Sequence, residues 1–178
     1  MYSKEISITE GVAVEVDDKK VKVSGNKGEL KREFKLTHDV KIQKEDNKIK
    51  VVSELSDRKT KALVGTIIAH IRNMMKGVTE GYIYKMKIIY SHFPMNVKVD
   101  GDKVVTQNFL GERTPRIAKI IGNTQVKIEG QDIAITGIDL EDVGLTSSNI
   151  EQSCRIVGYD KRRFSDGIYR TQGKKVIS

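Results

Sequence analysis

The last twenty residues, 159–178, combine basic and aromatic side chains in a pattern that suits contact with a polyanion. Two residues of this segment are acidic and six are basic, a net charge of +4 out of the chain's formal +8; the basic ones are Lys161, Arg162, Arg163, Arg170, Lys174 and Lys175. Phe164 and Tyr169 are interleaved with them. Guanidinium groups bind phosphates in a forked geometry, and aromatic rings stack on exposed nucleobases. The segment favours nucleic-acid contact, and the alternative is a disordered, solubilising extension.

A second basic stretch occupies residues 108–119 and begins at Asn108. Arg113, Arg116 and Lys119 recur there at three-residue intervals. The matching stretch of the first half of the chain has two glutamates among its basic residues and so carries less net positive charge. With a sequence pI near 9.4, the whole chain is suited to a partner rich in phosphate.

No arrangement of side chains in the sequence has the spacing of a catalytic or metal site. The histidines are scattered, at His38, His70 and His92. The single cysteine, Cys154, falls on the apolar face of a predicted helix, where it would pack as a small hydrophobe. Paired carboxylates near residues 17 and 100 occupy matching predicted turns, which accounts for them without chemistry. We therefore expect no enzymatic activity, no cofactor, no bound metal and no small-molecule substrate.

A repeated phrase organises the elements that must position these residues. Residues 16–21, Val-Asp-Asp-Lys-Lys-Val, return as residues 99–104, Val-Asp-Gly-Asp-Lys-Val. In both places alternating apolar residues flank an Asp-rich pair, which is the pattern of a β-hairpin. Each copy closes with an amphipathic stretch whose apolar residues recur every three or four positions, and this predicts one helix.

The alternation also predicts the other elements. In the first copy it indicates an arm over 1–10 and strands over 12–16, 21–23, 30–36, 40–42 and 49–51. Arg32 interrupts an apolar face and places the strand 30–36 near a sheet edge. A helix follows along the stripe 63–78, with Ser56 as its N-cap and Gly77 at C′. In the second copy we expect a strand over 82–90, a hairpin around 131–132 and a helix over about 140–157 that ends at Gly158.

Together these elements predict an α+β fold with two tandem homologous domains, each an antiparallel β-sheet covered by one α-helix, and a basic C-terminal tail. The predicted boundaries are 1–80, 81–158 and 159–178. One cysteine permits no internal disulfide, the first residues lack the apolar region of a signal peptide, and no apolar run is long enough to span a membrane. We expect a soluble intracellular protein without membrane contact.

Four segments resemble a known family, the large ribosomal subunit protein six family in its archaeal and eukaryotic form. They are residues 75–86 (MKGVTEGYIYKM), 90–97 (YSHFPMNV), 108–112 (NFLGE) and 163–169 (RFSDGIY). Their order matches that family along nearly all of residues 5–172. The match weakens after Tyr169, so that Lys174 and Lys175 are candidates on charge alone.

The resemblance implies a structural, non-catalytic protein of the cytoplasmic ribosome. It implies binding to large-subunit rRNA near the sarcin–ricin loop, close to where translational GTPases dock, mainly through the second domain and the tail. It also implies that the first domain lies toward neighbouring ribosomal proteins at the stalk base. The candidate RNA-binding residues are Asn108, Arg113, Arg116, Lys119, Lys161, Arg162, Arg163, Phe164, Tyr169, Arg170, Lys174 and Lys175. The alternative function is a tandem protein-interaction module that uses exposed sheet edges.

Overall fold

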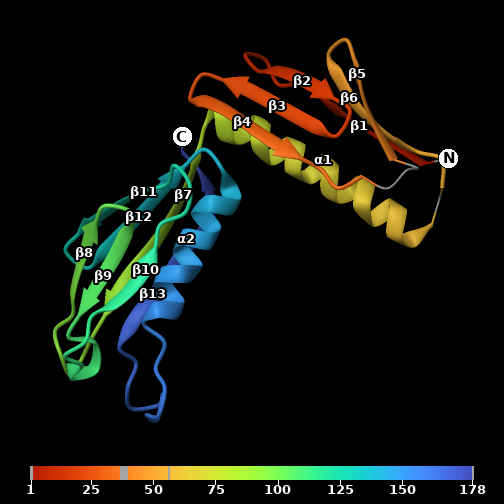
Figure 1. Cartoon of the computed structure of the whole chain (residues 1–178). Helices are drawn as coiled ribbons and strands as arrows, with labels where there is room; N and C mark the ends of the chain where they lie inside the picture. Colours follow the sequence, from red (N-terminus) through yellow and green to blue (C-terminus); the bar gives the residue numbers. More distant parts are fainter. Residues whose placement is uncertain (1, 37–39, 56, 178) are drawn as a thin grey trace. The chain divides into compact units, whose positions relative to one another are not determined.

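The computed structural model describes residues 2–36, 40–55 and 57–177 and divides the chain into two compact units. The first unit ends at Gly81, and the second begins at Tyr82. Each unit contains antiparallel sheets and one long helix (Figure 1). This confirms the α+β fold with two tandem copies that the sequence predicts. In each copy, however, the strands form two sheets rather than one.

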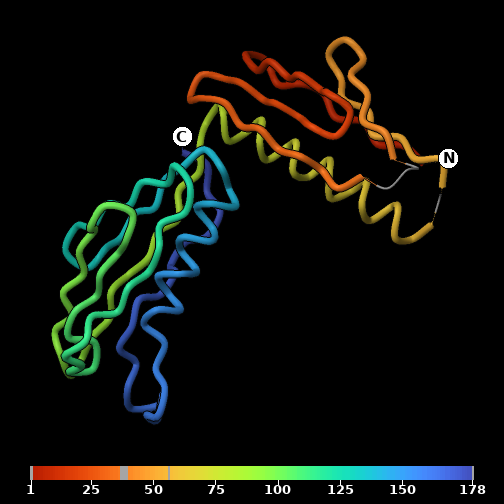
Figure 2. The backbone as a smooth tube through the Cα atoms, viewed as in Figure 1, coloured from red at the N-terminus to blue at the C-terminus, as the bar shows by residue number. Residues whose placement is uncertain are grey.

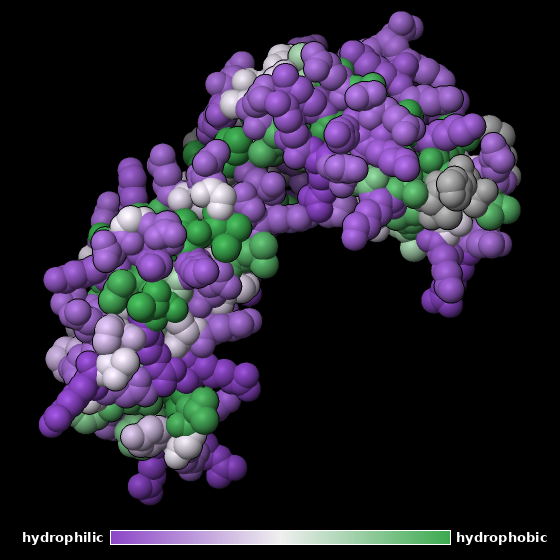
Figure 3. Space-filling model, viewed as in Figure 1, coloured by the Kyte–Doolittle hydropathy of each residue, from purple (hydrophilic) through white to green (hydrophobic). Residues whose placement is uncertain are grey.

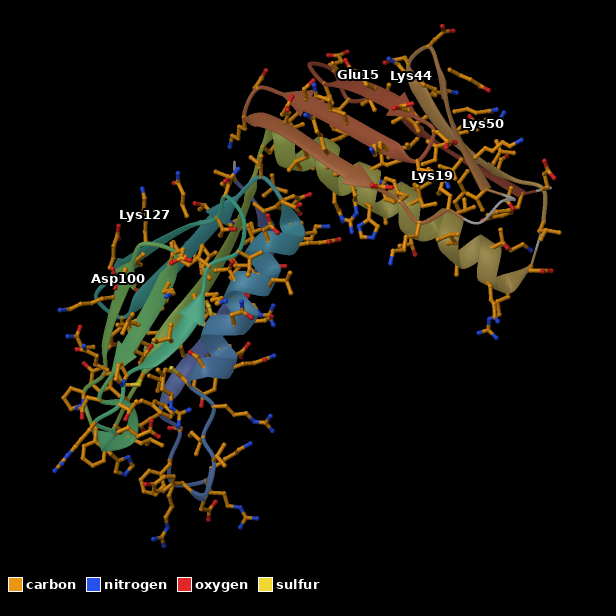
Figure 4. All side chains as sticks on the ribbon, in the orientation of Figure 1. Glu15, Lys19, Lys44, Lys50, Asp100 and Lys127 are labelled. Atoms are coloured by element: carbon orange, nitrogen blue, oxygen red, sulfur yellow. The ribbon has the colours of Figure 1, made fainter. Side chains whose placement is uncertain are left out.

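In the first unit, two three-stranded sheets pack against helix α1. One sheet has the order β2-β3-β4 and the other β1-β6-β5. Val21, Val23, Ile49 and Val51 of the strands are fully buried together with the apolar stripe of α1. The Lys44 ammonium group on β5 donates to the Val14 carbonyl on β2 at 2.9 Å and so links the two sheets (Figure 4). The bounds are β1 (Tyr2–Ser7), β2 (Ala13–Asp17), β3 (Lys20–Gly25), β4 (Gly28–Glu33), β5 (Val40–Glu45), β6 (Lys48–Ser53) and α1 (Arg58–Thr79).

The second unit repeats this plan and adds one strand. Its sheets have the orders β10-β9-β8 and β11-β12-β7-β13, and α2 packs on both. The bounds are β7 (Tyr82–Ile89), β8 (Asn96–Asp100), β9 (Lys103–Gln107), the short 3-10 helix η1 (Phe109–Gly111), β10 (Arg116–Lys119), β11 (Gln125–Glu129), β12 (Asp132–Gly137), α2 (Leu140–Ser153) and β13 (Gly167–Val176).

The turns of the two copies match in backbone conformation. Asp18 and Gly101 stand at equivalent turns with φ of 45° and 57°, and Asp46 and Gly130 do so with 44° and 62°. Asp tolerates the left-handed region and Gly adopts it freely, which is why these types alternate between the copies. The second hairpin turn thus lies at Gly130–Gln131, one residue before its predicted place.

The prediction of an arm over residues 1–10 was wrong, because Tyr2–Ser7 forms strand β1 and pairs with β6. Its counterpart in the second unit is β7. The Ile8 N–H donates to the carbonyl of Asn47 at 2.9 Å, and the Ile88 N–H donates to that of Gln131 at 2.7 Å, at equivalent positions. Charged residues interrupt the apolar alternation of this strand, and pairing with β6 supplies the stability that its local pattern lacks.

Both helices differ in length from their predictions. Gly77 is buried inside α1, and the helix continues to Thr79; the C′ position belongs to Gly81, whose φ is +77°. The N-cap is Asp57, and the predicted cap Ser56 lies outside the described residues. Helix α2 ends at Ser153, before the predicted stop at Gly158. The helical period alone could not place these ends, because capping geometry decides them.

The segment predicted as a tail is a structural part of the second unit. Residues 167–176 form β13, which pairs antiparallel with β7 from Gly167 opposite Ile89 to Val176 opposite Tyr82. Ile168 on this strand is buried in the core. In the first unit the equivalent strand β1 stands at the end of its sheet, so that β13 occupies a place that has no counterpart among the described residues there.

Close packing of Gly25 against α1 predicts a destabilising substitution. A Cβ at Gly25 would lie 2.8 Å from Val78 Cγ2 and 2.9 Å from the Val78 carbonyl oxygen. We expect Gly25→Ala to lower the free energy of unfolding by about 1–3 kcal/mol through overpacking. Gly65→Ala is the matched control, since its Cβ meets only Lys4 Nζ at 3.9 Å. That control should raise stability by up to about 1 kcal/mol through helix propensity. Urea unfolding measures both, and equal effects would contradict the packing argument.

Candidate nucleic-acid interface

Three of the six basic residues of the C-terminal segment lie in a loop, residues 158–166, which we call the tail loop. It leaves the end of α2 and returns into β13 (Figure 2). Asp160 shapes it: its carbonyl accepts the N–H groups of Arg163 and Phe164 at 3.0 and 2.9 Å, and its carboxylate accepts the Arg162 N–H at 2.9 Å. This turn leaves Lys161, Arg162 and Arg163 exposed to solvent.

A buried carboxylate fixes the base of the tail loop. Asp166 has no exposed surface. It accepts the Ser91 N–H at 3.2 Å, the Ser91 hydroxyl at 3.0 Å and the His92 N–H at 3.5 Å. Burial alone would raise the pKa of Asp166, but these hydrogen bonds outweigh it and hold the pKa below its ordinary value. The end of β7 and the start of β13 are therefore joined through one charged group.

Contacts between aromatic rings also hold the tail loop against the segment that contains His92. The Phe164 ring stacks on His92 with 4.6 Å between centroids and an angle of 29°, and it meets Tyr159 at 4.9 Å and 53°. Tyr159 is 51% exposed, and Phe93, which follows His92 in the sequence, is 43% exposed. Such rings, beside arginines, are surfaces on which unpaired bases can stack.

The second basic stretch lies at the same end of this unit. Asn108 adopts a left-handed φ of 59° and donates from Nδ2 to the Pro94 carbonyl at 3.0 Å. A Cβ on Gly111 would lie 3.5 Å from the Phe93 ring, which shows how closely η1 approaches the 91–95 segment. The two stretches, 50 residues apart at Arg113 and Arg163, thus flank one common loop.

Arg116 holds this arrangement together from the inside. Its guanidinium donates from Nε and Nη2 to the Glu112 carboxylate at 2.8 and 2.6 Å, and from Nη1 to the Ser153 and Arg155 carbonyls at 2.9 and 3.3 Å. It also lies over the Phe109 ring, 4.6 Å from the centroid. The hydrogen-bonded pair lowers the pKa of Glu112 and raises that of Arg116. The N–H groups of Arg116 are thus donated to carbonyl and carboxylate oxygens within the protein.

The structure brings eight of the predicted site residues to this end. They are Asn108, Arg113, Arg116, Lys161, Arg162, Arg163, Phe164 and Tyr169. Three residues that the sequence did not single out lie with them: Arg155, Tyr159 and Phe93. Tyr159 and Phe93 lie inside stretches that the sequence analysis names, 159–178 and 90–97, and Arg155 precedes the first of these by four residues. We call the exposed set Arg113, Arg155, Lys161, Arg162 and Arg163, with the rings Tyr159 and Phe93, the basic end. Hydrophilic side chains project from the lower part of this unit in Figure 3.

Four predicted site residues lie elsewhere on the second unit, namely Lys119 on β10 and Arg170, Lys174 and Lys175 on β13. Lys119 is at the opposite end of β10, where it pairs with Lys103. Lys103 in turn pairs with Asp100, labelled in Figure 4, across the hairpin turn of β8 and β9. Lys174 and Lys175 are at the far end of β13, where Lys175 pairs with Ile83. Arg170 stands midway along β13, with its guanidinium 3.7 Å from the Glu151 carboxylate and 5.7 Å from the Tyr84 ring centroid. Tyr169 precedes Arg170 but lies beside the tail loop, since it lines the same surface hollow as Lys161 and Phe164; it is 38% exposed.

The cysteine and the histidine with a described ring contact in the first unit are packed against other residues of the protein. Cys154 is buried just beyond α2, and burial raises the pKa of its thiol, as expected of a packed residue rather than a nucleophile. His70 lies 6.2 Å from the Phe34 ring, and His38 falls outside the described residues. Among the residues with described positions, no three His, Cys, Asp or Glu side chains gather as a metal site would require. None of the helices in the described ranges has the length and apolarity needed to cross a bilayer.

The chain is thus a duplicated α+β protein whose second unit has basic and aromatic side chains at one end, a combination typical of nucleic-acid-binding proteins. Comparison with known proteins identifies its family. The family model described as "Ribosomal protein L6" matches residues 8–81 and 93–167, one match in each unit. Relatives named "Large ribosomal subunit protein uL6" include that of Desulfurococcus amylolyticus, which is 53% identical over 94% of this chain and 92% of its own length. Those of Ignicoccus hospitalis and Methanocella arvoryzae are 49% and 48% identical, over 92% and 94% of this chain and 90% and 95% of their own.

The chain belongs to the ribosomal protein L6 family. The matches cover both copies of the repeat and end at Gly167, so they include the tail loop. Family membership confirms the resemblance found in the sequence, together with the expectation that the chain is a structural protein and not an enzyme.

The Asp166 attachment predicts a pH-dependent loss of stability. Because the folded-state pKa is lowered, the carboxylate stabilises the fold fully above its unfolded pKa near 4, and the gain is lost as pH falls through the folded pKa. We expect Asp166→Asn to lower the free energy of unfolding by about 1.5–3 kcal/mol at neutral pH, since hydrogen bonds to a charged group are removed. That deficit should shrink as the medium becomes acidic.

Thermal unfolding of both proteins from about pH 7 down to pH 3 measures this difference. The exposed Asp132→Asn, at the start of β12, serves as the control for loss of one negative charge. An Asp166→Asn deficit that stays constant across the range would contradict the role assigned to the carboxylate.

Proposed function

We propose that this chain is a constituent of the large ribosomal subunit and that its basic end binds large-subunit rRNA in the cytoplasm. The observation that carries the proposal is the joining of two basic segments, distant in sequence, into one exposed surface by Asp166 and Arg116. The names and high identity of the relatives support the assignment to the large subunit. The sequence resemblance further supports a site near the sarcin–ricin loop, where translational GTPases dock.

The proposed contact works through phosphates and exposed bases. Arg113, Arg162 and Arg163 present planar forks, which match phosphate oxygens better than the point charge of a lysine does. Tyr159 and Phe93 offer ring faces for bases that leave the helical stack. Because the loops are held by hydrogen bonds before RNA arrives, little ordering free energy opposes binding. Arg116 contributes indirectly, by keeping the 112–116 segment against the end of α2.

Removal of two tail-loop charges tests the proposal. We expect Arg162→Ala/Arg163→Ala to weaken binding to a large-subunit rRNA fragment. The plot of log affinity against log salt should also become flatter, by about one unit for each phosphate that the variant no longer neutralises. The matched control is Lys174→Ala/Lys175→Ala, which removes the same charge at the far end of β13. Filter binding at several salt concentrations measures both.

Equal losses of affinity in the two double variants would show that net charge, rather than the basic end, drives binding. Point substitutions are needed here because truncation after Gly158 would remove β13 and expose core residues such as Ile168. Such a truncated chain would lose affinity through unfolding alone. Arg113→Ala is a third arm, on the other segment of the basic end, and should weaken binding without lowering the unfolding temperature.

A second role, for the first unit, is contact with neighbouring ribosomal proteins at the stalk base through its sheet edge. The observation that favours it is the comparison of β1 with β7. Tyr82 and Met86 on β7 are buried to 0% and 1% exposure beneath a sheet completed by β13, whereas Tyr2 and Ile6, at the equivalent places on β1, are only half-buried. An edge strand presents main-chain donors and acceptors that a polypeptide strand can pair with and RNA cannot.

A photo-crosslinking residue in assembled large subunits tests this second role. Placed at Ser7 on β1, it should crosslink to a ribosomal protein. The matched control is Lys87 on β7, which stands opposite Asp132 in the same place that Ser7 holds opposite Lys48. Because β7 is flanked on both sides, a crosslink to protein is not expected there. Crosslinks from Ser7 to RNA alone, or none, would contradict the proposed contact.

A further inference from the structure

A cavity of about 400 Å³ opens beside the tail loop, between the last turn of α2 and the start of β13. Its apolar lining comes from Cys154, Ile156 and Ile168, which are exposed to only 3%, 7% and 1%. This volume falls in the range of roughly 300–1,000 Å³ that small ligands occupy in proteins. The position matters because the cavity borders the loop that carries the exposed arginines of the basic end.

Two aromatic rings also line the cavity, and both are held in place. The Phe164 ring is stacked on His92, at 4.6 Å, and contacts Tyr159 on another edge. The Tyr169 ring rests on the chain at Gly167, where an added Cβ would come within 3.2 Å of three of its atoms. Since contacts within the protein already orient these rings, a planar ligand would find them arranged before it binds.

The remaining lining is polar and basic. Gln152 and Ser165 supply an amide and a hydroxyl that can donate or accept hydrogen bonds, and Arg155 and Lys161 supply positive charge. The one acidic lining residue, Glu151, has its carboxylate 3.7 Å from the Arg170 guanidinium. A ligand that suits these groups is flat and partly apolar, has hydrogen-bonding edges and carries an anionic attachment.

We propose that this cavity receives one unstacked nucleobase of the bound RNA. The base would lie against the Phe164 and Tyr169 rings, its edge toward Gln152 and Ser165. The adjoining phosphate would contact Arg155 or Lys161. The inference rests on the proposed function, because it names how the basic end engages RNA, and it adds a base-binding pocket to a surface otherwise described by phosphate contacts.

Methyl NMR on the full chain, with labelled isoleucines, tests the pocket directly. Titration with adenosine, guanosine, cytidine and uridine monophosphates should shift the Ile156 and Ile168 signals for at least one of them. Ribose 5-phosphate, which has the phosphate without the base, should leave both in place. Ile117, 56% exposed on β10, is the control methyl on the same unit. Unmoved Ile156 and Ile168 signals with all four nucleotides, or equal shifts with ribose 5-phosphate, would overturn the proposal.

Substitution at Tyr169 tests the pocket in the RNA complex. We expect Tyr169→Leu to lower affinity for the rRNA fragment by roughly fivefold to a hundredfold, the range for loss of one stacked base, and Tyr169→Phe to keep most of it. An unchanged unfolding temperature shows that the leucine variant is folded. If wild-type chain binds no large-subunit rRNA, the proposed function itself fails. If it binds, and Tyr169→Leu binds equally well, the pocket alone is refuted.

Discussion

The buried carboxylate of Asp166 is the contact on which the functional end of the second unit depends. A charge without exposed surface is costly unless it is fully hydrogen-bonded, and here Ser91 and His92 supply the donors. The same contact brings His92 under the Phe164 ring and sets where the tail loop leaves the sheet. The buried Asp166 carboxylate thus fixes the base of the tail loop, while the charged side chains at the tip of that loop remain exposed to solvent.

The two units share one α+β fold, and the proposed functions depend on the features in which the units differ. Both copies share the hairpin turns, the helix and even the hydrogen bond from Ile8 or Ile88. Within the described parts of the chain, only the second copy continues into another strand, and pairing of β13 with β7 completes the burial of Tyr82 and Met86. The first copy keeps β1 as a sheet edge. One fold thus carries the basic end, which we propose binds RNA, in one unit and a strand edge in the other.

Particular residues show how far sequence reasoning reached. The alternation around Asp18 and Gly101 predicted both hairpins, because period-two burial and left-handed turns are local properties. Arg116 was grouped with Arg113 on spacing, yet its partners Glu112 and Ser153 direct it into the protein. Spacing could not separate these two arginines, since the deciding acceptor, the Ser153 carbonyl, is 37 residues away. Likewise, β1 was missed because its stability comes from pairing with β6 rather than from its own sequence.

By itself, the sequence determined the α+β class, the two-copy organisation, the family and the basic character of the last twenty residues, since periodicity, turn chemistry and charge are written along the chain. Tertiary structure alone decided that half of the predicted tail is a sheet strand anchored in the core by Ile168, that two basic segments meet at one end, and that Phe164 and Tyr169 border a cavity. The physical reason is that these features depend on long-range pairing and on which donors meet which buried acceptors. No local pattern along the chain encodes which distant residues come into contact.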